Sequence, residues 1–517
     1  MPEGEKIKKE LPANYVWPNK PSPCTWKASG NSEPNPHTKR TFKPELHKTY
    51  PDILHVIGNT HLVKLNKIPQ SEGIKCDMYA KCEFLNPGGS VKDRIGFRMV
   101  LDAEEKGILK PGCTIIEPTS GNTGVGLAMA CAVKGYKCLI VMPDKMSNEK
   151  VATLKALGAT IIRTPTEAGF DDPSGLIAEA YRLQAQIKDS IILNQYINPG
   201  NPLAHYDGTA TEVLWQLDND IDLFVMGAGT GGTISGVGRK IKEACPKCKI
   251  VGADPYSSIL AQPPELNITD VVKYEVEGIG YDFIPSVLDL NVVDVWEKTS
   301  DKESFLMARR LQKEEGFLCG GSSGAAMVVA LKYAKHLKEG QKCVVLLPDN
   351  IRNYMTKFVS DNWMEARDFK EVPLDENNHW WWNQKVEKLN SPKPVIISPE
   401  TKTNEAIKLL KENNLEILMV VDDNGNIIGA VTLENLMPKL VSSNLKYSDE
   451  IRSSVYKKYI KVTPDDILGK VGRILEVETF VVLVDDGQIQ TPKLTGVVTR
   501  MDFLKYITSK ESQTNGA

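Results

Sequence analysis

The sequence predicts an α/β protein with mainly parallel sheets, followed by a smaller pair of domains. From about residue 50 to 365, short apolar runs alternate with segments of helical period, which is the pattern of parallel strands covered by helices. Glycine-rich loops follow several of these runs, at the strand ends where such sheets bind ligands. The runs expected to form strands are 114–117, 137–142, 160–163, 223–226, 249–252 and 343–347.

The C-terminal part contains an internal repeat, which predicts two similar domains within residues 393–510. LMVVDDNG at 418–425 is similar to FVVLVDDG at 480–487, and a second apolar run and a helical stretch follow each of them. Units of this kind pair because neither can bury its apolar face alone. We expect copies at about 393–441 and 456–508, joined to the α/β part, residues 49–365, by a polar linker at 366–392.

The composition excludes several classes of function. The 517 residues include 63 basic and 66 acidic side chains, a formal net charge of −3, so no overall field favours nucleic acid or an anionic membrane. No apolar run approaches the roughly 20 residues that span a bilayer, and the N-terminus resembles neither a secretory signal nor a transit peptide. We therefore expect a cytoplasmic protein that binds neither nucleic acid nor membrane.

Lys92 follows Gly88-Gly89-Ser90-Val91 at the predicted start of a helix. A positive charge at that position opposes the helix dipole, which lowers the pKa of the ammonium group and favours a nucleophilic amine. A surface lysine at an ordinary helix start is the alternative interpretation.

Two more loops carry polar groups at predicted helix starts. Thr119-Ser120-Gly121-Asn122-Thr123-Gly124 combines hydroxyl, amide and N–H groups in a site suited to a carboxylate. Gly320-Gly321-Ser322-Ser323-Gly324 opens another helix. For both loops, a capped turn without a ligand is the alternative.

The loop Gly227-Ala228-Gly229-Thr230-Gly231-Gly232-Thr233 follows the run at 223–226 and matches the pattern G-x-G-x-x-G. With Asp254 near the spacing of a ribose-binding acid, a dinucleotide-dependent oxidoreductase is the alternative from another class. The two threonines instead favour a cradle for a single terminal phosphate, and a dinucleotide site leaves the lysine loop unexplained.

Together the four loops resemble those of the fold-type II pyridoxal-phosphate enzymes. The resemblance implies that Lys92 binds pyridoxal 5'-phosphate as a Schiff base and acts as the catalytic base, that Asn122 contacts the ring oxygen of the cofactor, and that Ser322 lies at its pyridine nitrogen. The residues implied to hold the phosphate are Gly229, Thr230, Gly231, Gly232 and Thr233. A neutral hydroxyl at the pyridine nitrogen gives a weaker electron sink than a carboxylate, which favours β-elimination and β-replacement over transamination.

Within that family, the loops at 201–207 and 277–283 resemble those of cystathionine β-synthases, and the C-terminal repeat resembles a pair of CBS domains. This implies condensation of serine with homocysteine to cystathionine and water, with hydrogen sulfide release from cysteine as a further activity. The implied substrate-binding residues are Thr119, Ser120, Thr123, Gln195, Tyr206, Gly280 and Tyr281. Cysteine synthesis from O-acetylserine and sulfide is the nearest alternative, but it leaves the C-terminal repeat unexplained.

Residues 1–48 are too polar to fold alone. Cys24-Thr25-Trp26 and Pro36-His37 resemble the haem-binding module of animal cystathionine β-synthases, which implies a haem b with Cys24 and His37 as axial ligands. The resemblance also implies that Arg239 pairs with the thiolate and connects the haem to the phosphate loop through one helix. A solvated arginine is the alternative at that position.

The resemblance to CBS domains implies an adenosine ligand such as S-adenosylmethionine. The second copy has the motif residues Thr499 and Asp502, whereas the first copy has Asn435 in place of the aspartate. Arg500 is also bulky at a position that is usually small, so a repeat that serves only assembly or autoinhibition is the alternative. We expect a homodimer or a higher homo-oligomer.

Overall fold

The computed structural model divides the chain into two compact units, Met1–Thr356 and Lys357–Ala517, which are described separately. It describes residues 11–22, 24, 35–38, 40, 49–144, 146–165, 168–271, 273–374, 379–389, 391, 393–441, 445–456, 459–485 and 493–509. Within these ranges, no helix has both the length and the apolar character needed to cross a membrane.

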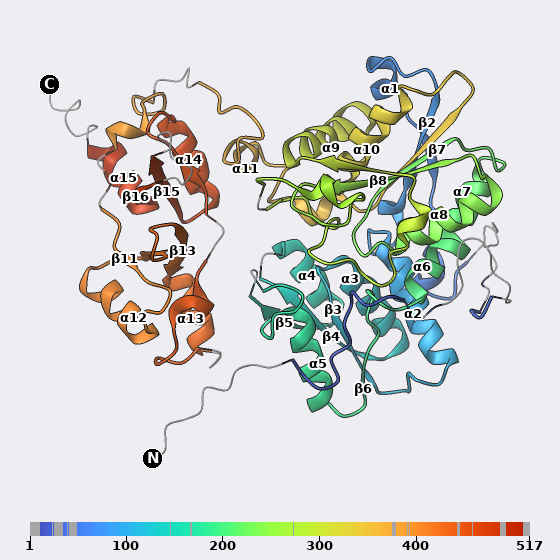
Figure 1. Ribbon diagram of the computed structural model, residues 1–517, viewed down its shortest axis with the longest axis horizontal. Coiled ribbons are helices and arrows are strands. Elements are labelled where there is room, and N and C mark those ends of the chain that lie inside the picture. The colour runs from blue at the N-terminus through green and yellow to red at the C-terminus, as the bar shows by residue number, and fades with distance from the viewer. Residues whose placement is uncertain are drawn as a thin grey trace. The chain divides into compact units, whose positions relative to one another are not determined.

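The first unit contains a mainly parallel sheet and a smaller, entirely parallel one, which confirms the parallel arrangement that the alternation of strand and helix predicted (Figure 1). The larger sheet has the strand order β1-β2-β10-β7-β8-β9, and only the β1–β2 pair is antiparallel. Its strands are β1 (Leu62–Lys64), β2 (Asp77–Cys82), β7 (Leu223–Gly227), β8 (Lys249–Pro255), β9 (Val295–Thr299) and β10 (Lys342–Leu347).

The smaller sheet is entirely parallel and has the order β5-β4-β3-β6. Its strands are β3 (Thr114–Pro118), β4 (Lys137–Pro143), β5 (Thr160–Thr164) and β6 (Ser190–Ile192). All six predicted strands are present, as β3, β4, β5, β7, β8 and β10. The strands β1, β2, β6 and β9 were not predicted.

Helices cover both faces of the larger sheet because its strands are apolar on both sides. Alternate residues such as Val225 and Val345 pack toward α9 and α10, while their neighbours Phe224 and Val344 pack toward α7 and α8. The longer helices of the unit are α2 (Lys92–Glu105), α3 (Asn122–Lys134), α4 (Asn148–Ala156), α5 (Leu176–Gln186), α7 (Ala210–Gln216), α8 (Gly232–Ala244), α9 (Asp301–Glu315) and α10 (Gly321–Ala334). Short helices are α1 (Lys67–Ser71), α6 (Gly200–Ala204) and the π-helical turn His205–Thr209.

Helices α2 and α3 approach so closely that their backbones are in contact. A Cβ added at Gly96 would lie 2.6 Å from the carbonyl carbon of Gly126, and one added at Gly126 would lie 2.8 Å from the carbonyl oxygen of Lys92. Any larger residue at either glycine would push the helices apart. The packing therefore fixes the first turns of both helices, which begin at Lys92 and Asn122, beside each other.

The second unit contains two copies of a strand–helix–strand–strand–helix motif, which confirms the predicted repeat. The first copy comprises β11 (Ile396–Ile397), α12 (Thr403–Glu412), β12 (Ile417–Val421), β13 (Ile427–Thr432) and α13 (Leu433–Val441). The second comprises β14 (Lys461–Val462), α14 (Leu468–Val477), β15 (Phe480–Asp485), β16 (Lys493–Thr499) and α15 (Arg500–Ser509).

The segment predicted as a linker contributes to the packing of the second unit. Val386 and Leu389 are buried in the core of the second copy, and the ring of Trp381 lies 5.2 Å from that of Phe503 in an edge-to-face arrangement. This unit also contains α11 (Asp361–Glu365). Trp381 therefore acts as a packing residue of this unit.

A buried ionic network anchors the first turn of α2 to the larger sheet. Arg94 donates to Glu83 over 2.7 Å and to Glu212 over 2.6 Å, and Glu212 also accepts from Lys81 over 2.6 Å. The four side chains are at most 5% exposed. Buried charges of this kind must all be paired, since one left alone is not solvated.

We predict that Arg94→Met lowers the free energy of unfolding by about 3–5 kcal/mol, because it leaves buried carboxylates with too little positive charge. Urea denaturation followed by tryptophan fluorescence measures the change. The control is Lys332→Met, which breaks the pair of a 59% exposed lysine with Glu297 and should cost less than about 1 kcal/mol. Equal costs for the two variants would contradict the anchoring role of Arg94.

Candidate active site

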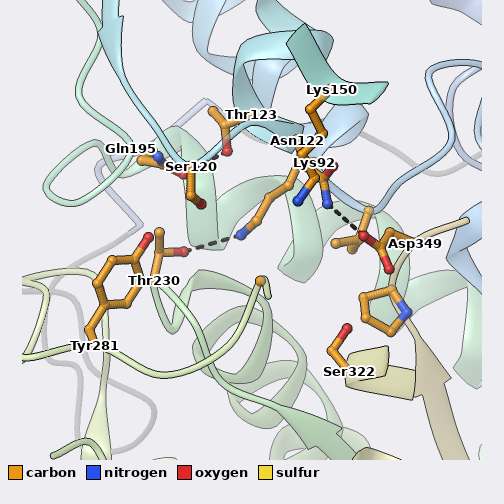
Figure 2. Close-up of a pocket in the computed structure, with 13 residues that line it drawn as sticks. Lys92, Ser120, Asn122, Thr123, Lys150, Gln195, Thr230, Tyr281, Ser322 and Asp349 are labelled. Atoms are coloured by element: carbon orange, nitrogen blue, oxygen red, sulfur yellow. Dashed lines mark hydrogen bonds between the residues drawn. The ribbon is translucent and has the colours of Figure 1, made fainter. Parts of the chain in front are cut away.

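A cavity in the first unit lies where loops after β3, β7 and β10 meet the first turns of α2, α3 and α10 (Figure 2). Its lining residues come from both sheets and from all four loops that the sequence singled out. They are Val91, Lys92, Ser120, Asn122, Thr123, Lys150, Gln195, Thr230, Gly278, Tyr281, Ser322, Pro348 and Asp349.

The amine of Lys92 points into this cavity and donates to the Thr230 hydroxyl over 3.3 Å (Figure 2). Burial lowers the pKa of Lys92 to about 8. The sequence suggested the helix dipole as the cause, whereas the structure shows removal from water, which disfavours the charged form. The neutral fraction of the amine near physiological pH is therefore far larger than in an ordinary lysine, and the neutral form is the one that acts as a nucleophile and a proton acceptor.

Thr123 and Gln195 form a polar patch on one side of the cavity. The Thr123 hydroxyl donates to Gln195 Oε1 over 2.6 Å. The backbone of Gln195 is held by Glu117, whose carboxylate accepts its N–H over 2.8 Å. Burial raises the pKa of Glu117 to about 7. Ser120 lies on the same loop as Thr123. Together these residues and Gln195 offer hydroxyl and amide groups to a carboxylate.

The loop between β7 and α8 forms a cradle that only glycine can build. Gly231 has a φ of +83°, and a Cβ there would lie 2.5 Å from Leu288. A Cβ at Gly229 would lie 2.5 Å from the carbonyl oxygen of Gly278. The bare backbone N–H groups at the start of α8, with the Thr230 and Thr233 hydroxyls, make a site for a phosphate.

Ser322 and Asp349 lie on the opposite side of the cavity from Tyr281 (Figure 2). Ser322 is buried in the first turn of α10. Asp349 accepts from the Asn122 side chain over 2.9 Å and from the Tyr354 hydroxyl over 2.5 Å, so it holds Asn122 in place.

Comparison with known families gives two matches in this chain. Residues 53–349 match the family described as pyridoxal-phosphate dependent enzyme, and residues 386–442 match the CBS domain. A protein of Apis mellifera named cystathionine beta-synthase is 54% identical over 503 residues, which cover 97% of this chain and 99% of that protein. A protein of the same name from Rattus norvegicus is 49% identical, over 96% of this chain and 92% of that protein.

The chain belongs to the cystathionine β-synthase family of pyridoxal-phosphate-dependent enzymes.

Solved structures of similar proteins match the first unit. An O-acetylserine-dependent cystathionine beta-synthase from Helicobacter pylori is 38% identical with a TM-score of 0.56, covering 60% of this chain and 99% of its own. A hydrogen sulfide-producing enzyme from Fusobacterium nucleatum is 39% identical with a TM-score of 0.55, covering 59% of this chain and 100% of its own. The predicted fold class is therefore confirmed.

The cavity fits the cofactor of this family. A lysine with a lowered pKa, a glycine cradle at a helix start and a buried serine at another helix start all face one space. Asp254, the residue on which a dinucleotide site would depend, instead pairs with Lys298 over 2.7 Å and accepts the N–H of Ala261. The alternative of a dinucleotide-dependent oxidoreductase is wrong.

Three of the predicted substrate-binding residues lie outside the cavity lining. Thr119 is buried, and its hydroxyl accepts the N–H of Gly121. Gly280 donates its N–H to Ala228 and so ties the loop of Tyr281 to the phosphate loop. Tyr206 lies on the π-helical turn, where its hydroxyl donates to Glu243 over 2.5 Å. A substrate contact of Tyr206 stays a prediction.

The sequence analysis missed Lys150 and Asp349. Asp349 follows the strand predicted at 343–347 by two residues, so its position at a strand end was a usable signal. Lys150 lies on α4 and pairs with Glu277 over 2.5 Å, in the loop predicted to bind substrate. A contact between residues so far apart in the chain leaves no local pattern.

Cys24 and His37 lie together although thirteen positions separate them. Cys24 Sγ is 3.0 Å from His37 Nε2, and both residues are half-buried. Burial and the nearby charges of Lys106 and Arg98 lower the pKa of His37, which favours the neutral ring. Arg239, on α8, donates to Asp289 over 2.8 Å. Thr25 and Trp26 lie outside the described residues.

In the second CBS copy, Thr499 and Asp502 bind each other at the start of α15. Asp502 Oδ2 accepts the Thr499 hydroxyl over 2.7 Å and its backbone N–H over 3.0 Å. In the first copy the corresponding pair is Thr432 and Asn435, at 2.6 Å. Binding of an adenosine ligand to Thr499 and Asp502 stays a prediction, as does the homo-oligomer.

We predict that the rate at which apoprotein combines with pyridoxal phosphate rises with pH and levels off above about 8, because only the neutral Lys92 amine attacks the aldehyde. The absorbance of the bound cofactor, followed at a series of pH values, measures this rate. A lysine of ordinary pKa, about 10.4, would give a rate that keeps rising well above that point. Lys92→Ala is the control and should show no covalent cofactor absorbance.

Proposed function

We propose that the chain catalyses β-replacement of the serine hydroxyl by the thiol of homocysteine, giving cystathionine and water. The observation that carries the proposal is one cavity that joins the Lys92 amine, the carboxylate patch of Thr123 and Gln195, and the glycine cradle. The names of the honeybee and rat relatives support the same product.

The polar patch binds the substrate carboxylate and so fixes the substrate Cα near Lys92. Ser120, Thr123 and Gln195 provide the hydroxyl and amide groups for this contact. The Thr119 hydroxyl accepts the N–H of Gly121 and so supports the loop that contains Ser120. Because these groups lie on rigid elements after β3 and β6, the carboxylate is held without reorganisation.

Lys92 moves the protons of the reaction. Its amine takes the proton from Cα of serine, and the resulting ammonium can supply a proton to the departing hydroxyl, so that water leaves. As the homocysteine sulfur bonds to Cβ, the thiol gives its proton to the neutral Lys92 amine, and Lys92 delivers that proton to Cα. With a pKa near 8, the Lys92 side chain can both accept and donate a proton near neutral pH.

Bound pyridoxal phosphate supplies the electron sink for the pair released at Cα. Lys92 would hold it covalently, Gly229 to Thr233 would hold its phosphate, Asn122 would meet its ring oxygen and Ser322 its pyridine nitrogen. Asp349 fixes the Asn122 amide by accepting from its Nδ2. A neutral serine at the ring nitrogen keeps the sink weak, which favours loss of the β-substituent.

The test is a product assay by mass spectrometry. We predict that serine plus homocysteine yields cystathionine and that Lys92→Ala abolishes it, because no other group then moves the Cα proton. Parallel tubes contain O-acetylserine with homocysteine, O-acetylserine with sulfide, and cysteine with homocysteine, the last to detect hydrogen sulfide. Cysteine formed from O-acetylserine and sulfide as the sole product would contradict the proposal.

We further propose that Cys24 and His37 would hold the iron of a haem b. A thiolate and an imidazole are common iron ligands, and the fold places these two side chains next to each other. Among the described residues, no cluster of three or more histidine, cysteine or acidic side chains offers a competing metal site.

We predict that Cys24→Ser and His37→Ala each lose the haem absorbance of the purified protein while keeping pyridoxal phosphate, because the two sites use different residues. Absorption spectra and a haem extraction assay measure both groups. Cys245→Ser, at another half-buried cysteine, is the matched control and should keep its haem. Full haem content in both variants would contradict the assignment.

A further inference from the structure

Residues 11–20, which we call the strap, form a set of contacts that the reaction described above does not use. At one end, the Tyr15 hydroxyl donates to the backbone oxygen of Phe170 over 2.6 Å, and Asn14 donates to Gln184 over 3.3 Å. At the other end, Ser286 donates its N–H to Pro18 over 2.8 Å. The Ser286 hydroxyl also donates to the backbone oxygens of Pro18 and Lys20.

The two ends of the strap bind different halves of the first unit. Phe170 and Gln184 lie in the connection from β5 to β6, in the smaller sheet's half. Ser286 lies between β8 and β9, in the larger sheet's half. The strap therefore joins two halves that otherwise meet around the cavity, where each supplies part of the lining.

A continuous set of aromatic rings leads from the strap to the cavity. The Tyr15 ring lies 5.2 Å from that of Trp17, which lies 6.4 Å from that of Phe170. Tyr15, Phe170, Phe283 and Tyr281 belong to one packed cluster. The ring of Phe170 lies 4.8 Å from that of Phe283, which lies 5.2 Å from that of Tyr281. Tyr281 lines the cavity opposite Ser322 (Figure 2).

Tyr281 is held from a second side by Tyr196. Their rings lie 5.6 Å apart in an edge-to-face arrangement, and their hydroxyl oxygens are 3.5 Å apart. Tyr196 is almost fully buried and follows Gln195 of the carboxylate patch. The aromatic cluster therefore spans both halves and includes the neighbour of a substrate-binding residue.

We propose that Tyr15 is a positioning residue for the substrate pocket: together with Ser286 it fastens the two halves of the first unit across the aromatic cluster and holds Tyr281 against the cavity. The carboxylate patch belongs to the smaller sheet's half, whereas Thr230, Tyr281 and Ser322 belong to the larger sheet's half, so binding depends on the separation of the two halves. This inference rests on the proposed function in naming serine as the substrate.

The first arm of the test separates substrate binding from chemistry. Tyr15→Phe removes only the hydrogen bond to Phe170 and should raise KM for serine about fivefold with kcat nearly unchanged, since one such bond is worth about 1 kcal/mol. Tyr15→Ala, which also removes the ring, should raise KM further. Tyr447→Phe, at a tyrosine that is 65% exposed, is the matched control and should change neither constant.

A double-mutant cycle tests whether the two ends act as one strap. Ser286→Ala removes the hydroxyl contacts with Pro18 and Lys20 but keeps the backbone N–H bond to Pro18, so it loosens the other end and should also raise KM. Because loosening either end frees the halves, Tyr15→Ala combined with Ser286→Ala should be little worse than the more severe of the two alone. Fully multiplicative effects would overturn the proposal.

Hydrogen–deuterium exchange without substrate provides a readout that does not depend on the reaction. Tyr15→Phe and Ser286→Ala should both speed exchange in residues 168–175 and 281–287, with no change in the second unit. If the parent enzyme makes no cystathionine, the proposed function fails while this arm still decides the role of the strap. Exchange rates and KM within about twofold of the parent in all variants would overturn the proposal.

Cys24 lies four residues beyond the strap, so a strap variant could act indirectly by disturbing the haem. The haem absorbance of the same samples distinguishes this indirect effect from a direct effect on the substrate pocket. Unchanged spectra in Tyr15→Phe with a raised KM would support a direct action on the pocket. A KM effect that appears only in samples that have lost haem would overturn it.

Discussion

Helices α2 and α3 touch through the backbone at Gly96 and Gly126, and the geometry of the site depends on this contact. Gly126 lies against the carbonyl of Lys92, so the first residue of α2 is fixed relative to the first turn of α3. The amine of Lys92 and the side chains of Asn122 and Thr123 consequently share one cavity. A side chain at either glycine would separate the base from the carboxylate patch by moving whole helices.

Two lysines near this contact show how surroundings set function. Lys81 is fully buried beside Glu212, whose carboxylate it needs as a partner, and it serves the network that anchors Arg94 and hence α2. The Lys92 amine instead donates to the neutral Thr230 hydroxyl, and burial brings its pKa to about 8. Both lysines are removed from water. Lys81, paired with Glu212, has a structural role, whereas Lys92 can accept and donate a proton.

The sequence predicted the strands and loops whose signal is local. Runs such as 223–226 and 343–347 are apolar throughout, and both form central strands of the larger sheet. The division into two sheets was not predicted, because it depends on which strands pair, and short edge strands such as Leu62–Lys64 carry little pattern. The C-terminal repeat was visible because each copy repeats the same order of elements.

The candidate site shows the same division between local and distant signals. Lys92, Asn122, Thr230 and Ser322 were found because each lies in a glycine-rich loop at a helix start. Lys150 and Tyr15 were missed, since each acquires its position only through partners more than a hundred residues away, Glu277 and Phe170. Tyr206 was included on its resemblance to a known loop, but its hydroxyl faces Glu243.

We propose that Lys92, among the lysines of this chain, carries the cofactor. Reducing the holoenzyme with borohydride fixes pyridoxal phosphate on its lysine, and peptide mass spectrometry then locates the modified residue. We expect the phosphopyridoxyl group on Lys92 alone. Lys150, which lines the same cavity but is paired with Glu277, is the competing position, and the group there would contradict the proposal.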